Sequence, residues 1–259
     1  MHYHDLPNLR IIPVANILLH ELHDNKRVLR LQREISGDKI MINPPIVALI
    51  KGTKNYVVLD GANRTTCIKN LGYQHIVVQI VDYFDKRQVR LGKWDHLICG
   101  LNKKDKLLMV SIIQNSDFVT VDDKYNILIK QIQKNKLPEQ LAFIKSLFKQ
   151  YKDKTFYRVI GNHIDNFRGE YKNINFLVIY PKLKPTEIID IAKNNLKVPS
   201  GITRHIIPNR AIGIALDLSI LGLKKSLSWK NNYLKKLIDA RLSAHKIRYY
   251  KEPIIIFND

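Results

Sequence analysis

The chain has 259 residues, with 43 Lys and Arg against 23 Asp and Glu, and carries a formal net charge of +20 at pH 7. Apolar residues make up 45% of it, which predicts a globular protein with one large domain or two small ones. No apolar run approaches the ~20 residues of a membrane span. Two cysteines, Cys67 and Cys99, exclude a disulfide scaffold and a cysteine-based zinc site. The N-terminal residues show no signal-peptide pattern, so we expect a reduced, cytoplasmic location.

The net positive charge suggests a nucleic-acid partner. The ratio of Lys to Arg and the dispersal of the basic residues along the chain argue against this interpretation. Lysines outnumber arginines 30 to 13, and Lys is less suited than Arg to bidentate recognition of phosphate or guanine. The basic residues are also dispersed, and the densest stretch, 103–154, is spaced like the solvated faces of helices. We therefore expect no sequence-specific nucleic-acid binding and no membrane partner.

The first part of the chain has the pattern of a small α/β unit. The expected strands lie within 9–19, which also holds a turn, and over 46–50, 56–60 and 75–83. Apolar residues at helical spacing predict a helix over 26–36, and a second helix is expected from Gly61 to Gly72. The strand 56–60 therefore leads through a glycine turn directly into a helix.

The rest of the chain is predicted to be more helical. The expected helices cover 103–116, 122–136, 138–152, 185–196 and 226–245. The expected strands cover 175–181, 201–208, 247–250 and 254–257. These elements predict an α/β (α+β) fold with two lobes, 1–92 and 93–259, and a ligand cleft between the lobes.

A first candidate motif, Asp60-Gly61-Ala62-Asn63-Arg64, lies at the predicted strand-to-helix junction. A glycine there lets the backbone approach a ligand, and the free N–H groups of a helix start favour an anion. Arg64 adds a fork for phosphate oxygens, and Asp60 suits a metal ion or a hydroxyl. The pentapeptide is equally compatible with a surface turn in which Asp60 caps the helix and Arg64 is solvated.

A second candidate motif is His20-Glu21, followed by His23, Asp24 and Arg27. A carboxylate at the end of an early strand acts as a general base when it faces a ligand. The chain has only six glutamates, so few other residues compete for this role. The alternatives are an exposed Glu near an Arg, and a metal site, for which the spacing lacks a recognisable ligand set.

A third candidate motif is the segment 198–210, VPSGITRHIIPNR. It places Thr203, Arg204 and His205 on extended backbone between glycine and proline, an arrangement that suits anion binding. The alternative is a buried strand whose Arg pairs with an Asp. Trp94 is a candidate for stacking on a ligand, although such a Trp more often belongs to the core.

The early part of the chain resembles the N-terminal domain of the ParB/sulfiredoxin superfamily. The resemblance rests on IIPVANILLHE (11–21), NPPIVALI (43–50) and YVVLDGANRTTCIKNLG (56–72). Sulfiredoxins place a nucleophilic Cys where this chain has Ala62. ParB nucleotide-binding proteins carry a Gly-Glu-Arg-Arg type of turn, whereas the turn here is Gly-Ala-Asn-Arg.

Three further features resemble the free L-serine kinases, which phosphorylate free serine to O-phospho-L-serine. They are LHE with Arg27 six residues after Glu21, LGKW (91–94) and VPSGITRHIIPNR (198–210). The resemblance spans nearly the whole chain. These kinases usually show Asp-Gly-x-His-Arg in the turn, and this chain has Asn63 in place of the His. Asn can donate a hydrogen bond to phosphate but cannot become cationic.

The resemblance implies an enzyme that transfers a phosphoryl group from ATP or ADP, with Mg²⁺, to the hydroxyl of L-serine for siderophore (2,3-diaminopropionate) or cysteine biosynthesis. It implies that Glu21 accepts the hydroxyl proton and that Asp60 orients the nucleophile or the Mg²⁺ ion. Arg27 and Trp94 would bind serine. The implied phosphate-binding residues are Gly61, Asn63, Arg64, Thr65, Thr203, Arg204 and His205.

Two other classes of function stay open at this point. One is a ParB-like DNA-binding or regulatory protein, although the helices after residue 100 show no clear helix-turn-helix pair. The other is a sensor of serine or nucleotide that has lost turnover. The sequence leaves open the nucleotide, the pathway and the formation of a homodimer.

Overall fold

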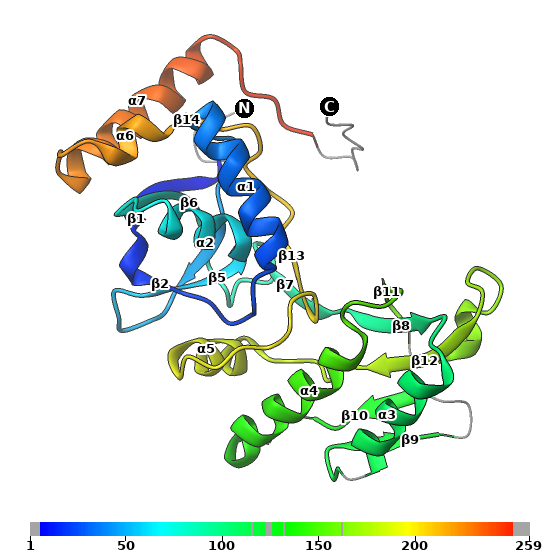
Figure 1. Cartoon of the computed structure of the whole chain (residues 1–259). Coiled ribbons are helices and arrows are strands. Elements are labelled where there is room, and N and C mark those ends of the chain that lie inside the picture. Colours follow the sequence, from blue (N-terminus) through cyan, green and yellow to red (C-terminus); the bar gives the residue numbers. More distant parts are fainter. Residues whose placement is uncertain (1–5, 115, 123–125, 132, 162, 251–259) are drawn as a thin grey trace.

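A computed structural model describes residues 6–114, 116–122, 126–131, 133–161 and 163–250. It has the mixed α/β fold that the sequence predicts, with a sheet in each of two lobes (Figure 1). The two-stranded ribbon of β7 (Arg90–Lys93) and β13 (Thr203–Ile206) is antiparallel and runs between the lobes. None of the described helices is long and apolar enough to cross a membrane.

The sheet of the first lobe has five strands in the order β1-β6-β4-β5-β2. They are β1 (Asn8–Pro13), β2 (Ile17–Leu18), β4 (Ile46–Leu49), β5 (Tyr56–Asp60) and β6 (His75–Val81). A short 3-10 helix, η2 (Val14–Asn16), joins the first two strands. Helices α1 (Asn25–Asp38) and α2 (Ala62–Asn70) contact each other. The strands and helices of this lobe named here agree with the elements predicted from the sequence.

The sheet of the first lobe is covered on both faces because its residues alternate between two cores. Val47 and Val58 belong to a cluster that lies against α1 and α2. Their neighbours Ala48 and Val57 belong to a second cluster, which continues into the other lobe and includes Ile98. The hydrophobic core is therefore continuous from one lobe to the other.

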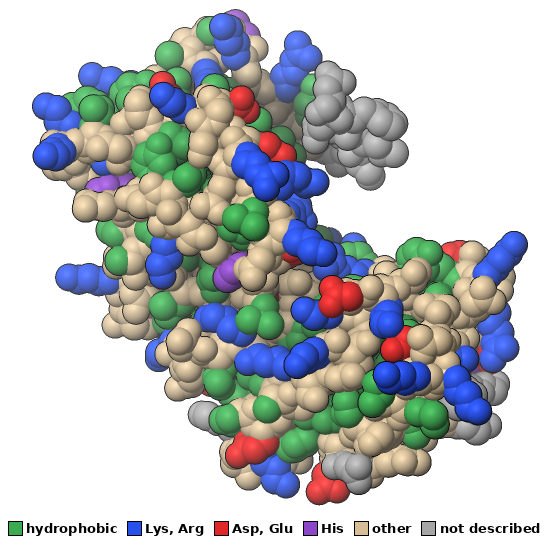
Figure 2. Space-filling model, viewed as in Figure 1, with side chains coloured by type: hydrophobic (Ala, Val, Ile, Leu, Met, Phe, Trp, Pro, Cys, Tyr) green, Lys and Arg blue, Asp and Glu red, His purple; other side chains and the backbone are tan. Residues whose placement is uncertain are grey.

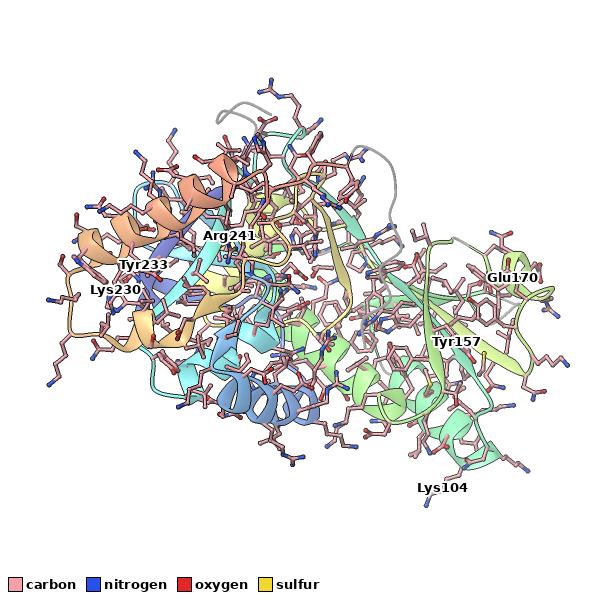
Figure 3. All side chains as sticks on the ribbon, turned by 90° about the horizontal axis from the view of Figure 1, so that it is seen from above. Lys104, Tyr157, Glu170, Lys230, Tyr233 and Arg241 are labelled. Atoms are coloured by element: carbon pink, nitrogen blue, oxygen red, sulfur yellow. The ribbon has the colours of Figure 1, made fainter. Side chains whose placement is uncertain are left out.

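The C-terminal part of the chain returns to the first lobe. The returning elements are β14 (Leu216–Asp217), α6 (Leu218–Gly222) and α7 (Leu227–Ser243). Strand β14 pairs with β3 (Ile40–Met41). The Asn231 side chain bonds both backbone groups of Ile11, and the buried Lys230 donates to the Leu221 carbonyl. Figure 3 shows Lys230 and Arg241 along α7 on this lobe. The division at residues 92 and 93 stays a prediction.

The sheet of the second lobe has the order β11-β8-β12-β10-β9. Its strands are β8 (Asp95–Cys99), β9 (Val119–Val121), β10 (Asn126–Ile129), β11 (Phe156–Val159) and β12 (Ile174–Ile179). The helices of this lobe are α3 (Lys103–Gln114), α4 (Leu137–Tyr151) and α5 (Pro185–Lys193), with the 3-10 turns η3 (Lys134–Lys136) and η4 (Ile164–Phe167).

Two predicted elements are wrong. The helix expected over 122–136 is instead the strand β10 followed by the turn η3, because β10 pairs with β9 on one side and β12 on the other. Ile127 and Ile129 are buried while Leu128 is exposed, which is the period of a strand. The strand expected over 247–250 is irregular backbone. The strand expected over 254–257 lies outside the described residues.

Candidate active site

The turn between β5 and α2 exposes the N-terminus of the helix. Gly61 has φ +94° and is the N-cap residue of α2, and no side chain caps this end. A Cβ at Gly61 would approach the Cα and Cβ atoms of Pro45 to 3.0 Å. Glycine is therefore required both by the backbone conformation and by the close approach of Pro45. The free N–H groups of the first turn are available to an anion.

Asp60 is the acidic centre of this turn. Its Oδ2 atom accepts from Arg64 Nη2 at 2.8 Å and from Arg210 Nη1 at 3.2 Å. Arg64 also donates to the Asn43 carbonyl at 3.1 Å, which fixes its guanidinium against the turn. The pair of arginines leaves Asp60 half-buried in a positive environment that suits phosphate groups.

Glu21 is joined to the third motif by backbone hydrogen bonds. It forms a parallel bridge with Val198, in which Leu22 donates to the Val198 carbonyl at 2.8 Å and Val198 donates to the His20 carbonyl at 2.9 Å. Burial raises the pKa of the Glu21 carboxyl from 4.5 to about 7, although the Gly201 N–H and the Thr203 hydroxyl both donate to the carboxylate. Its proton affinity thus suits exchange near neutral pH.

His20 is buried and neutral because burial lowers its pKa to about 4. Its Nδ1 atom lies 2.8 Å from the Val58 carbonyl, so Nδ1 carries the proton and Nε2 is an acceptor. Thr203 Oγ1 lies 3.0 Å from this Nε2 atom and 3.3 Å from Glu21 Oε2. A protonated Glu21 can therefore donate to Thr203 while the Thr203 hydroxyl donates to His20.

His205 has protein partners at both ring nitrogens. Its Nε2 atom lies 2.7 Å from the Tyr83 hydroxyl, and its other nitrogen bonds the Leu59 carbonyl. Burial holds its pKa well below the usual value, so the ring is neutral. The preceding residue in the motif, Arg204, places its guanidinium 4.4 Å above the Trp94 ring, a cation–π contact that links β13 to the start of β8.

The structure brings Glu21, Asp60 and Thr203 close together. Thr203 Oγ1 lies 3.3 Å from Glu21 Oε2, and the negative charge of Asp60 adds to the rise in the pKa of Glu21. Arg27 lies on α1, is exposed and lowers the pKa of Arg64 by its charge. It therefore lies near the turn between β5 and α2.

Two predicted phosphate-binding residues have structural partners. The Asn63 side-chain oxygen accepts from the Asp24 backbone N–H at 2.8 Å and joins the starts of α1 and α2, which leaves its NH₂ group as a donor. The Thr65 hydroxyl donates to the Gly61 carbonyl at 3.0 Å within the helix. Roles in nucleotide binding for these two residues stay predictions.

The sequence analysis named His20 only as part of the second motif, and it did not single out Tyr83 or Arg158. His20 and Tyr83 hold the third motif by hydrogen bonds, and the Arg158 guanidinium lies against Gly201. His20 adjoins Glu21, so its position was a usable signal. Tyr83 and Arg158 reach the site only through tertiary structure, and no local pattern marks them.

A dedicated metal cage is absent from the described residues, which hold no group of three or more His, Cys, Asp or Glu side chains able to bind a metal ion. The alternative metal site at His20, His23 and Asp24 therefore has no support. Mg²⁺ is usually held by one or two carboxylates together with substrate phosphates, and the role of Asp60 toward a nucleotide-bound Mg²⁺ ion stays a prediction.

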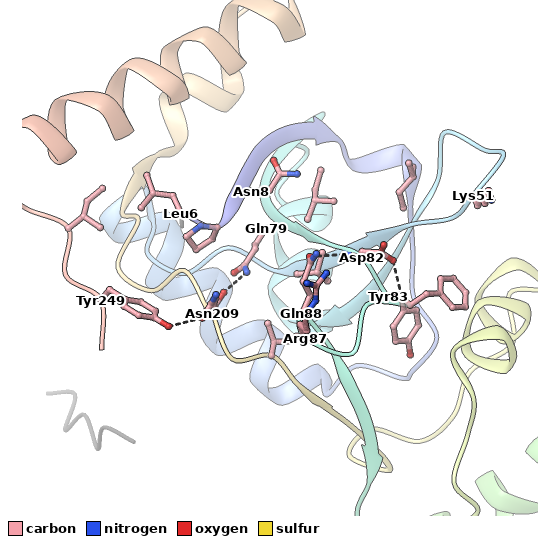
Figure 4. Close-up of a pocket in the computed structure, with 17 residues that line it drawn as sticks. Leu6, Asn8, Lys51, Gln79, Asp82, Tyr83, Arg87, Gln88, Asn209 and Tyr249 are labelled. Carbon is pink, nitrogen blue, oxygen red and sulfur yellow. Dashed lines mark hydrogen bonds between the residues drawn. The ribbon is translucent and has the colours of Figure 1, made fainter. Parts of the chain in front are cut away.

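A cavity of about 1500 Å³ lies beside β6 (Figure 4). Its walls come from the first lobe and from the segments 207–209 and 247–249. Tyr83 lines it and also bonds His205, so the cavity borders the site. The ligand cleft expected between the lobes stays a prediction.

Comparison with solved structures shows the same fold in L-serine kinases. SbnI from Staphylococcus aureus, with a C-terminal truncation, superposes with a TM-score of 0.69 at 21% identity, over 92% of this chain and 98% of that one. A free serine kinase in complex with AMP gives a TM-score of 0.65 at 18% identity, over 83% and 94% of the two chains. No model of a known protein family matches the chain.

Comparison of sequences shows the family. The ATP-dependent L-serine kinase of Staphylothermus marinus is 30% identical over 217 residues, which cover 76% of this chain and 85% of that protein. The ATP-dependent L-serine kinase SbnI of Staphylococcus aureus is 22% identical over 95% of this chain and 97% of that protein. The chain is therefore a phosphotransferase that acts on an alcohol group. It belongs to the family of L-serine kinases, as the sequence motifs predicted.

Proposed function

We propose that this enzyme transfers the terminal phosphoryl group of ATP to the hydroxyl of free L-serine, with Glu21 as the general base. The observation that carries the proposal is the Glu21 carboxyl, whose pKa of about 7 allows it to gain and lose a proton at neutral pH. The charge of Asp60 also acts on the Glu21 carboxyl. Asp60 stands at the turn that leads into the uncapped N-terminus of α2. ATP as donor is supported by the names of the relatives.

In the proposed reaction the serine hydroxyl oxygen attacks the terminal phosphorus atom. The new O–P bond forms as the bond between that phosphorus and the bridging oxygen breaks, and ADP leaves with the bond electrons. The hydroxyl proton passes to the Glu21 carboxylate. Phosphoryl transfer requires positioning and charge neutralisation more than covalent help from the protein.

Charge neutralisation is assigned to the turn and to the third motif. The backbone N–H groups at the start of α2 and the guanidinium of Arg64 cradle the phosphates of the donor. Asp60 would hold Mg²⁺ bound to the nucleotide, and that ion would neutralise phosphate charge. Arg204, oriented by its contact with Trp94, is assigned to the transferred group.

His20 and His205 are assigned to positioning. Both rings are neutral, and each uses one nitrogen to bind a carbonyl of β5. His20 thereby holds Thr203 beside Glu21. His205, two residues further along β13, fixes this strand against Tyr83. These contacts keep the third motif in register with the base.

The proposal is tested by incubating the purified protein with L-serine, Mg²⁺ and either ATP or ADP, and by measuring O-phospho-L-serine. We expect Glu21→Gln to lower kcat by at least ~10²-fold, because the variant cannot accept the proton. In the wild type, kcat/KM should rise with pH through about 7, as the base ionises.

The matched control is Glu34→Gln, which removes an exposed carboxylate that pairs with Arg30 on α1. It should retain wild-type turnover. Near-full activity of Glu21→Gln would show that the assigned base is wrong. Absence of phosphoserine with both nucleotides would contradict the kinase activity itself.

A further inference from the structure

Arg158 and Gly201 are in close contact at the site, although they are 43 positions apart in the chain. Gly201 has φ +80°, and a Cβ at this position would overlap the Arg158 guanidinium. The guanidinium therefore lies directly across the Cα atom of Gly201. Arg158 comes from β11, the edge strand of the second sheet, where it pairs with His96. Glycine in the third motif thus makes room for an arginine from a different part of the fold.

The contact between Arg158 and Gly201 lies next to Glu21, the proposed base. Gly201 donates its N–H to the Glu21 carboxylate, and the charge of Arg158 lowers the pKa of the same carboxyl. Arg158 is exposed and has no ion pair within the described part of the chain. Arg64 and Arg210 are instead both paired with Asp60. Arg158 is therefore a cation near the base that forms no ion pair with a carboxylate among the described residues.

The direction of attack decides what this cation faces. The attacking and leaving oxygens lie roughly in line in phosphoryl transfer. The turn assigned to the donor phosphates belongs to the first lobe, so the proposed in-line reaction brings the acceptor to Glu21 from the other side. Gly201 bonds the Glu21 carboxylate, and the Arg158 guanidinium from the sheet of the second lobe lies against Gly201. The guanidinium is therefore next to the acceptor, away from the donor phosphates.

We propose that Arg158 binds the carboxylate of the acceptor amino acid while Glu21 takes the proton of its hydroxyl. A guanidinium presents a rigid pair of N–H donors that matches the two oxygens of a carboxylate. This role deepens the proposed serine kinase activity and rests on it. It also differs from the expectation for Arg27, which lies near Arg64 on the phosphate side.

The test compares two acceptors in three variants. L-Serine and ethanolamine share the hydroxyl and the amine, but ethanolamine lacks the carboxylate. Arg158→Met should lower kcat/KM for L-serine by about 10- to 100-fold, the loss expected for hydrogen bonds to a charged group. The same variant should change kcat/KM for ethanolamine by less than about twofold, because the partner group is absent. Arg158→Lys should keep part of the preference for L-serine.

The matched control is Arg168→Met, which removes an arginine of the same lobe that pairs with Asp165. It should leave the preference for L-serine unchanged. Three results would overturn the role of Arg158: a wild type that uses ethanolamine as well as L-serine, no loss in Arg158→Met, or an equal loss with both acceptors together with a higher KM for ATP. The last result would assign Arg158 to the phosphoryl group.

Calorimetric titration of L-serine into the AMP-bound protein separates this inference from the kinase activity. If the wild type binds L-serine and Arg158→Met does not, Arg158 binds the acceptor even when no phosphoserine is formed. If the wild type makes phosphoserine and both proteins bind L-serine equally, only the inference about Arg158 fails. If the wild type neither binds nor phosphorylates L-serine, both proposals fail.

Discussion

Glu21 combines a functional need with a cost to stability. Burial disfavours its ionised form and raises its pKa to about 7, whereas Asp60 opposes ionisation further by its negative charge. Gly201, Thr203 and Arg158 act in the opposite direction. The protein therefore holds a carboxylate in surroundings that only partly compensate its charge, which is the expected state of a group tuned for proton transfer.

The raised pKa predicts a pH-dependent effect of Glu21→Gln on stability. An acid whose folded-state pKa lies above its ordinary 4.5 favours folding below that value, and this contribution is lost as the pH rises through about 7. Gln resembles the protonated form at every pH. We therefore expect the variant to melt at least about 2 °C above the wild type at pH 8, with a smaller difference at pH 5.

Thermal melts followed by circular dichroism at the two pH values measure this difference. Glu34→Gln serves again as the control, because it also replaces a carboxylate but on an exposed helix face. A difference between Glu21→Gln and the wild type that is equal at both pH values would contradict a raised pKa of Glu21.

At the scale of elements, the junction of β5 and α2 is built around one glycine. Gly61 adopts a left-handed conformation and lies against Pro45, so the strand passes into the helix without a side chain in between. The consequence is a helix N-terminus beside Asp60 with its N–H groups free. The position of these donors depends on the backbone rather than on any side chain of the turn.

This dependence predicts different effects for two glycine substitutions. Gly61→Ala and Gly72→Ala both place a Cβ on left-handed backbone, but only the first meets atoms within 4 Å. We expect both to lower the free energy of unfolding by about 1–3 kcal/mol. Only Gly61→Ala should also raise the KM for ATP, because relief of its contact with Pro45 shifts the start of α2.

Urea unfolding and steady-state kinetics with ATP measure the two effects. Gly72 lies past the opposite end of α2, so it is a control for the backbone conformation alone. An equal rise of KM for ATP in both variants would show that loss of stability, and not the position of the helix start, causes the change.

At the scale of the whole molecule, the two lobes share one hydrophobic core. Ile46 and Val57 of the first sheet belong to the same buried cluster as Ile98 and Phe176 of the second sheet. The returning helix α7 adds contacts between the C-terminal part and β1. Neither lobe can unfold without exposing apolar surface of the other.

The shared core predicts one cooperative unfolding transition. Differential scanning calorimetry of the full chain should give a single peak whose calorimetric and van't Hoff enthalpies agree. Two resolved transitions would show that the contact between the lobes contributes little to stability, and the lobes would then be separate folding units.

The net charge of +20 also acts at this scale. Lys and Arg side chains are spread over both lobes, and several lie over α1 beside the site (Figure 2). A positive field of this kind attracts anionic ligands such as nucleotides. That the protein binds no nucleic acid specifically stays a prediction, and the formation of a homodimer stays open.

The sequence by itself determined the features that depend on neighbours in the chain. The strand 56–60, the turn at Gly61 and the helix after it follow from local apolar spacing and from glycine chemistry. The LHE segment with Arg27, LGKW (91–94) and the segment 198–210 also predicted the family, which the comparison of sequences confirmed. Each of these features is encoded within a stretch of about 5–20 residues.

Only the tertiary structure decided the features that depend on pairing over long distances in the chain. Residues 126–129 form a strand and not a helix because β9 and β12 supply hydrogen-bond partners on both sides. Arg158 reaches Gly201, and Asn231 reaches Ile11, although no local pattern marks these contacts. The physical reason is that hydrogen bonds, burial and charge act through space, whereas a sequence pattern records only the spacing of residues along one element.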